Sequence, residues 1–319
     1  MSRPRLRRLL PPVLAGLLVG TTVGCGTSEP SASPPAGTST TAAAVDTHPV
    51  DTRTLELTDT SRATDPTPGE PGDEVAGRDL PTTVWYPTDG EGPYPVVVFS
   101  HGITSGPAAY DDLLSGWASA GFVVAAPTFP LTNADVDPVY TDVLNQPADV
   151  SFVLTQVLAL DTTAGDVLEG RLDPSAVAAA GHSGGAVTTI GLLNTCCADE
   201  RITAAVVLAG TLTGFGASFA QPGVPTLFEH GTADDTIPVA DGRAAFEAAP
   251  APKAFLGLRE ATHSSPYGKP EDPSFATVLA TTTDFLRSTL SGDADAARAL
   301  QEVLDDPRRD GLTDDQLDG

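Results

Sequence analysis

The stretch that decides the fold is AVAAAGHSGGAVTTIGLL, which spans residues 176–193. It begins with a run of small and apolar residues, continues with Gly-His-Ser-Gly-Gly, and ends with apolar residues at helical spacing. The first run predicts a buried strand, and the last run predicts a helix. Ser183 therefore stands between glycines where a strand turns into a helix, and a tight turn there exposes its hydroxyl.

The sequence on either side alternates between strand-like and helix-like stretches. The run YPVVVFS, residues 94–100, is typical of a strand buried on both faces. Further strands are expected within 52–58, 79–87, 122–130, 202–210, 224–231 and 253–263, and helices within 110–121, 146–160, 241–250 and 275–290. Buried strands that alternate with helices predict a mostly parallel sheet with helices on both sides. Ligands of such sheets bind at the carboxyl ends of the strands.

The composition suits one large α/β domain or two small ones. The chain has 319 residues, of which 40% are hydrophobic, and its 42 acidic and 17 basic side chains give a net charge of −25. Such a surface repels phosphate backbones, so we expect no nucleic-acid partner. We expect a strongly solvated, secreted monomer.

Residues 1–24 are expected to be an export signal. Four arginines among the first eight residues precede an apolar segment, 9–23, which is short and interrupted by prolines. The small residues before Cys25 resemble a bacterial lipobox, in which the cysteine is lipidated, although Thr22 stands where leucine is usual. A plain secretory signal is the alternative. We expect a lipoprotein of the cell envelope, or otherwise an extracellular protein, and the export route stays open.

The rest of the chain divides by composition into three parts. Residues 25–50 are rich in Ser, Thr, Pro, Ala and Gly, so they predict a flexible tether that holds the folded domain off the membrane. The folded domain is expected at 51–305, and an acidic C-terminal tail at 306–319. Cys196 and Cys197 are neighbours, and we expect two small buried residues at a helix end, because a disulfide between neighbours would be strained. No sequence motif indicates a metal site, and we expect no cofactor.

A serine hydroxyl needs a base to become a good nucleophile. In the strand–turn–helix setting of Ser183 the acid and then the histidine follow the serine in the chain. His263, in LREATHSSPYG, is the only histidine that follows a plausible acid. That acid lies in LFEHGTADDTIP, where Asp234 and Asp235 both come after a strand end and either could orient the imidazole.

Two backbone N–H groups are candidates for stabilising a negatively charged oxygen. Gly184 follows the serine and opens a helix, so its N–H can face a developing oxyanion. The segment FSHGITSG, residues 99–106, follows a buried strand, and we expect the N–H of Ile103 to pair with that of Gly184.

With these motifs in this order, the sequence resembles an α/β-hydrolase over about residues 52–290. The likeness is to bacterial platelet-activating-factor-acetylhydrolase-like, dienelactone-hydrolase-like and chlorophyllase-like proteins, with cutinases and polyester hydrolases close in architecture. It implies the α/β-hydrolase fold, a mostly parallel sheet flanked by helices. The family pattern His-Gly-x-x-Asp-x-x-[Val/Ile]-Pro implies Asp234 as the acid, with Ile237 and Pro238 at the expected offset and Asp235 as the fallback.

Three features bear on the substrate. Only residues 211–223 separate two predicted strands where this family often inserts a lid, so no large lid domain is expected. Phe215 and Phe219 in that loop are candidate acyl contacts, or else anchors that pack on the core. Cutinases carry a larger side chain at the position of Gly184, and polyester hydrolases often carry an aromatic at that of Ile103, which weakens the polyester reading.

The resulting hypothesis is a carboxylic-ester hydrolase that works through an acyl-serine intermediate with Ser183, His263 and Asp234, without metal or organic cofactor. Its substrate is expected to be a small-molecule or lipid-like ester, with polyesters as a further candidate. An acyltransferase or peptidase on the same residues is one alternative. A non-catalytic surface lipoprotein that binds apolar ligands is another.

Overall fold

The structure, a computed structural model, describes residues 47–67, 74–220, 222–306 and 310–314. The expected signal at 1–24, Cys25 and the tether up to residue 46 lie outside the described residues. None of the helices in the described ranges is long and apolar enough to cross a membrane.

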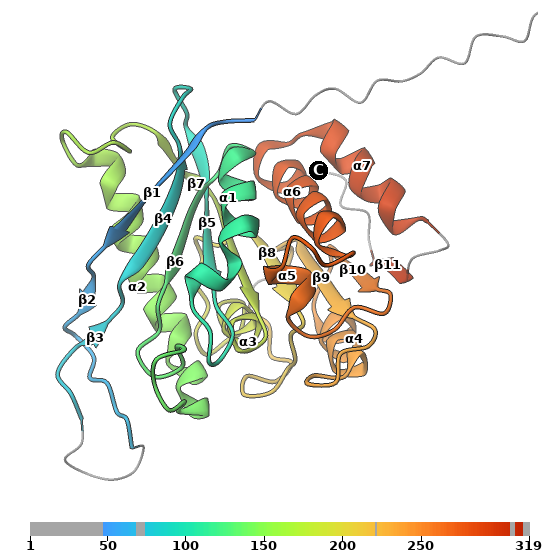
Figure 1. Ribbon diagram of the computed structural model, residues 1–319, viewed down its shortest axis with the longest axis horizontal. Coiled ribbons are helices and arrows are strands. Elements are labelled where there is room, and N and C mark those ends of the chain that lie inside the picture. Colours follow the sequence, from blue (N-terminus) through green and yellow to red (C-terminus); the bar gives the residue numbers. More distant parts are fainter. Residues whose placement is uncertain (1–46, 68–73, 221, 307–309, 315–319) are drawn as a thin grey trace, which may run out of the picture. The chain divides into compact units, whose positions relative to one another are not determined.

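A large sheet forms the centre of the fold (Figure 1). Over the described residues it has nine strands in the order β1-β4-β6-β5-β7-β8-β9-β10-β11. The six strands from β6 to β10 in this order are parallel, while β1, β4 and β11 at the edges are antiparallel. Their bounds are β1 Val50–Leu55, β4 Thr82–Pro87, β5 Tyr94–Ser100, β6 Val123–Pro127, β7 Leu172–His182, β8 Ala204–Leu208, β9 Thr226–Gly231, β10 Lys253–Leu258 and β11 Asp310–Asp314. The predicted mostly parallel sheet is therefore confirmed.

Helices cover both faces of this sheet (Figure 1). One face carries α1 Asp111–Ser119, α5 Ser265–Gly268, α6 Phe275–Ser291 and α7 Ala294–Leu304. The other carries α2 Gln146–Ala159, α3 Gly184–Gly191 and α4 Val239–Ala248. Three short 3₁₀ helices, η1 Pro107–Tyr110, η2 Tyr140–Leu144 and η3 Leu160–Thr162, and a two-stranded sheet of β2 Thr58–Asp59 and β3 Arg78–Asp79 complete the domain.

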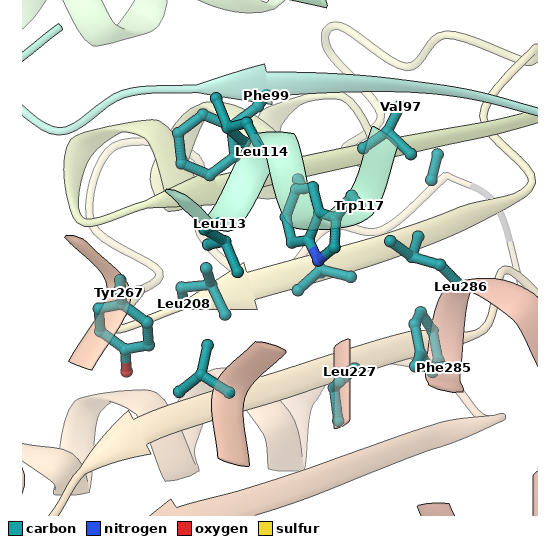
Figure 2. Packing of buried hydrophobic residues seen from close by; sticks show 14 of the residues in the cluster. Val97, Phe99, Leu113, Leu114, Trp117, Leu208, Leu227, Tyr267, Phe285 and Leu286 are labelled. Atoms are coloured by element: carbon teal, nitrogen blue, oxygen red, sulfur yellow. The ribbon is translucent and has the colours of Figure 1, made fainter. Parts of the chain in front are cut away.

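The core on the α1 face is built around Trp117. Figure 2 shows its indole among apolar side chains of the sheet, with Phe285 and Leu286 of α6 nearby. The ring is fully buried, and its N–H donates a 2.9 Å hydrogen bond to the hydroxyl of Thr282 on α6. The indole thus packs with its polar atom satisfied and joins two helices across this face.

Both expected ends of the folded domain need correction. The backbone N–H of His48 donates to the carbonyl of Ser119 at 2.8 Å, and Val50 pairs with Pro87, so residues 48–50 belong to the domain rather than the tether. Within the expected tail at 306–319, β11 pairs with β10. Its polar sequence DGLTD pairs through the backbone, which a hydrophobic pattern does not reveal.

The prediction for the two neighbouring cysteines was wrong. Cys196 and Cys197 form a disulfide with each other, and Cys196 is exposed rather than buried. The helix α3 ends at Gly191, and the chain then turns, with the N–H of Cys197 donating to the carbonyl of Asn194 at 3.0 Å. This turn carries the pair out to the surface instead of into the core.

Candidate active site

The turn that carries Ser183 depends on two backbones that meet without side chains. Ser183 has φ 56° and ψ −120°, a conformation that non-glycine residues rarely adopt. A Cβ on Gly185 would lie 2.0 Å from the carbonyl oxygen of Ser100, and one on Gly181 would lie 2.2 Å from that of Gly185. The first turn of α3 therefore sits directly against the end of β5, which holds the serine in its strained position.

Three side chains from separate loops form a continuous hydrogen-bonded chain. His263 Nε2 lies 2.8 Å from Ser183 Oγ, and His263 Nδ1 lies 2.7 Å from Asp234 Oδ2. The serine hydroxyl is therefore within hydrogen-bond reach of the imidazole. The side chain of Asp234 is fully buried, whereas that of His263 is 12% exposed.

The structure brings Asp234 to the imidazole and leaves Asp235 exposed. Asp234 Oδ1 accepts hydrogen bonds from the backbone N–H groups of Thr236 and Ile237, at 2.9 and 2.8 Å. Burial alone would raise the pKa of Asp234, but the hydrogen bonds from His263 and these two amides outweigh it and lower the pKa. The carboxylate is therefore charged and fixed beside His263.

His230, at the end of β9, is a supporting residue to which the sequence analysis gave no role. Its Nε2 lies 2.8 Å from the carbonyl oxygen of Ile237 and 3.2 Å from Asp234 Oδ2. A carbonyl can only accept, so Nε2 carries the hydrogen and points at the loop that presents the carboxylate. Burial lowers the pKa of His230, which keeps this imidazole neutral.

The amide of Ile103 lies beside the first turn of α3, next to Gly184. The amides on either side of it are occupied, since the N–H of Gly102 donates to Tyr110 Oη and that of Thr104 donates to the carbonyl of Thr132. These two bonds fix the peptide between them. Gly184 is the first residue of α3, so its N–H has no partner within the helix.

Packing explains why a glycine follows the serine. A Cβ on Gly184 would come within 2.6 Å of Ile103 Cγ1. The side chain of Ile103 thus occupies the space that a larger residue after Ser183 would need. The small residue at 184 and the branched residue at 103 are two halves of one packing arrangement.

A buried relay ties the loop of Gly102 to that of His263. The N–H of Gly102 donates to Tyr110 Oη at 3.2 Å, and Tyr110 Oη lies 2.8 Å from His182 Nδ1. His182 Nε2 lies 2.8 Å from the carbonyl oxygen of His263 and must donate to it, so Nδ1 accepts from the tyrosine hydroxyl. Burial lowers the pKa of His182 to about 3, so the imidazole stays neutral as this relay requires.

A cavity of about 850 Å³ opens over Ser183 and His263. Ile103 and Gly184 line it beside the serine, and Tyr140 and Leu144 of η2 line it as well. Among the described lining residues there is no aspartate or glutamate, although the protein is strongly acidic. Within the same described ranges, no cluster of three or more His, Cys, Asp or Glu side chains is placed to hold a metal ion.

Phe215 and Phe219 do not line this cavity, so their reading as acyl contacts is corrected to that of loop anchors. Phe219 packs against the core and pairs with Asn194, while the carbonyl of Phe215 accepts a hydrogen bond from the Asn194 amide. The loop folds back onto the end of α3, where the Phe215 ring lies against Gly191. The sequence also contains no indication of η2, whose apolar side chains carry no recognisable motif.

The neutral His182 predicts a pH-dependent stability. Its pKa is about 3 in the folded chain and near 6.5 when unfolded, so below pH 6.5 only the unfolded state gains its proton. This contribution to stability is present above pH 6.5 and is lost as the pH falls. Between pH 6.5 and 5.5, protonation of this residue in the unfolded state lowers the free energy of unfolding by about 1 kcal/mol. A plot of unfolding free energy against pH, measured with urea, should therefore have a slope that is smaller by about 1 kcal/mol per pH unit for His182→Gln than for the wild type. Equal slopes for both proteins would contradict the prediction.

Comparison with known proteins supports the fold assignment. The sequence model of the chlorophyllase family matches residues 72–216, which include Ile103, Ser183 and Gly184 but end before Asp234 and His263. No curated protein matches the chain. The matched segment spans the strands and helices on both sides of the Ser183 turn, and the remainder completes the same mostly parallel sheet. The fold is that of an α/β-hydrolase, and residues 72–216 are similar to the chlorophyllase family.

Proposed function

We propose that this protein is a serine hydrolase of carboxylic esters. The observation that carries the proposal is the chain Ser183 Oγ–His263 Nε2 and His263 Nδ1–Asp234 Oδ2, which opens into a cavity lined by Ile103 and Gly184. Similarity to the chlorophyllase family supports a hydrolase that acts on esters. The serine mechanism and the roles below are our proposal.

In the first half-reaction Ser183 Oγ attacks the ester carbonyl carbon while His263 Nε2 takes the hydroxyl proton. The carbonyl oxygen becomes an oxyanion, and the N–H groups of Ile103 and Gly184 stabilise it. Asp234 stabilises the imidazolium that forms. The C–O bond of the ester then breaks, and the alcohol leaves with the proton from His263, which gives the acyl-serine.

In the second half-reaction water attacks the acyl carbon while His263 Nε2 takes a proton from it. The bond between Ser183 Oγ and the acyl carbon breaks, and the proton returns to the serine. The products are a carboxylic acid and the free enzyme, so water is the only co-reactant. The substrates that we propose are apolar esters of small-molecule or lipid-like type, because Ile103, Val187 and Ile237 line the cavity and Lys269 is the one charged side chain among its described lining residues other than the histidines.

We further propose that the protein is exported and anchored through lipidated Cys25. In bacteria that express the full chain with an alkyne fatty acid, the protein should take up the label. Cys25→Ser should lose it, because the thiol of this residue carries the lipid. The double variant Cys196→Ser/Cys197→Ser should keep it, and label that persists in Cys25→Ser would refute the anchor.

The nucleophile is tested with the purified full-length chain. We expect a burst and then turnover of p-nitrophenyl acetate and butyrate, together with labelling by a fluorophosphonate probe, because both reactions require an activated Ser183. Ser183→Ala should lose the burst, the turnover and the label. A wild-type chain that neither turns over these esters nor takes the label would be a binding protein instead. Added alcohols or amines that compete with water distinguish acyl transfer and peptidase chemistry by their products.

The two neighbouring aspartates provide a matched pair of variants. Asp234→Asn should lose up to ~10⁴ in kcat, because the imidazole loses the partner that fixes its tautomer and stabilises its charge. Asp235→Asn should stay within about tenfold of the parent, as expected for an exposed residue outside the chain of contacts. If kcat for ester hydrolysis falls more in Asp235→Asn than in Asp234→Asn, Asp235 rather than Asp234 is the acid.

A further inference from the structure

The short helix η2, Tyr140–Leu144, has two faces with opposite chemistry. Tyr140, Thr141, Val143 and Leu144 line the cavity over Ser183. Tyr140 and Leu144 are 66% and 46% exposed, so they leave apolar surface uncovered at the site. Asp142, in the middle of the same helix, is instead 2% exposed and faces the interior.

Arg78 of β3 holds the buried face of η2. Its Nη1 and Nη2 donate to the two carboxylate oxygens of Asp142 at 3.0 and 2.8 Å. Its Nε and Nη2 donate to Asp149 of α2, each at 2.7 Å. Burial alone would lower the pKa of Arg78, but the bonds to Asp149 and Asp142 outweigh it and raise the pKa, so the guanidinium stays charged.

A second set of bonds joins the same segment to the helix that follows the nucleophile. The Gln146 amide oxygen accepts from the hydroxyl of Thr188 on α3 at 2.6 Å, and its Nε2 donates to Thr132 at 2.8 Å. Asn145 Nδ2 donates to Asp142 Oδ1 at 2.9 Å. The apolar face of η2 is thereby held at a fixed place relative to Ser183 from both sides.

We propose that η2 is the wall that binds the apolar chain of the ester, and that Arg78 is the positioning residue that sets the preference for chain length. The proposal rests on the serine esterase function proposed above and names its substrate class, neutral esters with an extended apolar acyl or alkyl chain. Such a chain would cover the exposed apolar surface of Tyr140 and Leu144. An acetyl or ethyl group covers less of that surface and gains less from it.

A buried Arg–Asp cluster is expensive to desolvate, and apolar residues of similar volume often match its stability. The cluster is therefore better explained by the position that it gives to η2 than by a gain in the stability of the fold. The forked guanidinium fixes two carboxylates from η2 and α2 in one plane, which lysine cannot reproduce. Contacts between this wall and the apolar chain of the substrate are the same in the ground and transition states. Their loss should therefore raise KM and leave kcat unchanged.

The test compares p-nitrophenyl acetate with p-nitrophenyl octanoate, and ethyl acetate with octyl acetate, on the full-length chain. We expect Leu144→Ala and Arg78→Lys to raise KM for a long-chain ester about tenfold, the scale of losing contact with a methylene or two. The kcat for that ester and both constants for the short esters should stay within about twofold. If Arg78→Lys does not fold, Asp142→Asn provides the same test, because it weakens the contact between Arg78 and η2 from the side of the aspartate.

Arg201→Lys is the matched control. Arg201 also pairs with an aspartate, Asp199, and bonds to α2 through the carbonyl of Ser151, but it contacts no residue of the cavity. It should leave the ratio of long-chain to short-chain kcat/KM unchanged.

Three results would overturn the proposal. One is an unchanged ratio in both ester series for Leu144→Ala. Another is an unchanged ratio for Arg78→Lys and Asp142→Asn. The third is a parallel loss of kcat for long and short esters in the Arg78 and Asp142 variants, with a lowered melting temperature, which would mark the cluster as structural only. A wild-type chain that hydrolyses none of the four esters and resists the fluorophosphonate probe would instead refute the esterase function itself.

Discussion

The contact between Gly185 and the carbonyl of Ser100 is the constraint on which the rest of the site depends. A side chain at 185 would overlap that oxygen at 2.0 Å, so the first turn of α3 can meet the end of β5 only through bare backbone. Because β5 and β7 are parallel neighbours, this contact also brings the loop of Ile103 beside Ser183. One steric condition therefore sets both the strained serine and the amide next to it.

The other members of the site come from loops after β9 and β10, and buried polar contacts hold these loops in register with the first two. His182 links the carbonyl of His263 to Tyr110, which in turn accepts the N–H of Gly102. His230 points at the loop that carries Asp234. Catalytic geometry tolerates only small displacements, and neutral imidazoles inside the protein supply direction without adding a charge that would compete with the carboxylate.

The sequence was sufficient where local chemistry determines structure. The run at 94–100 is β5 to the residue, and the Gly-His-Ser-Gly-Gly turn joins β7 to α3 as predicted. It was insufficient where partners are distant or pairing uses only the backbone. Arg78 and Asp142 are 64 residues apart, so the local sequence around either residue does not predict their contact. The strand β11 has a polar sequence, and the cavity wall of η2 is too short to show a helical period.

The two halves of the site are held by different means, and the difference fits what each half has to do. The groups that we propose to react are placed by backbone contacts that no side chain could relax, as at Gly185, and by hydrogen bonds near 2.8 Å. On our proposal the wall at Tyr140–Leu144 needs only a stable shape, and side chains of β3 and α2 outside the reacting centre provide it through Arg78 and Asp149. A change in the wall then alters which acyl or alkyl chain of the substrate fits, while the distance between Ser183 and His263 is kept. On this proposal, substrate preference and chemistry are separable in this fold.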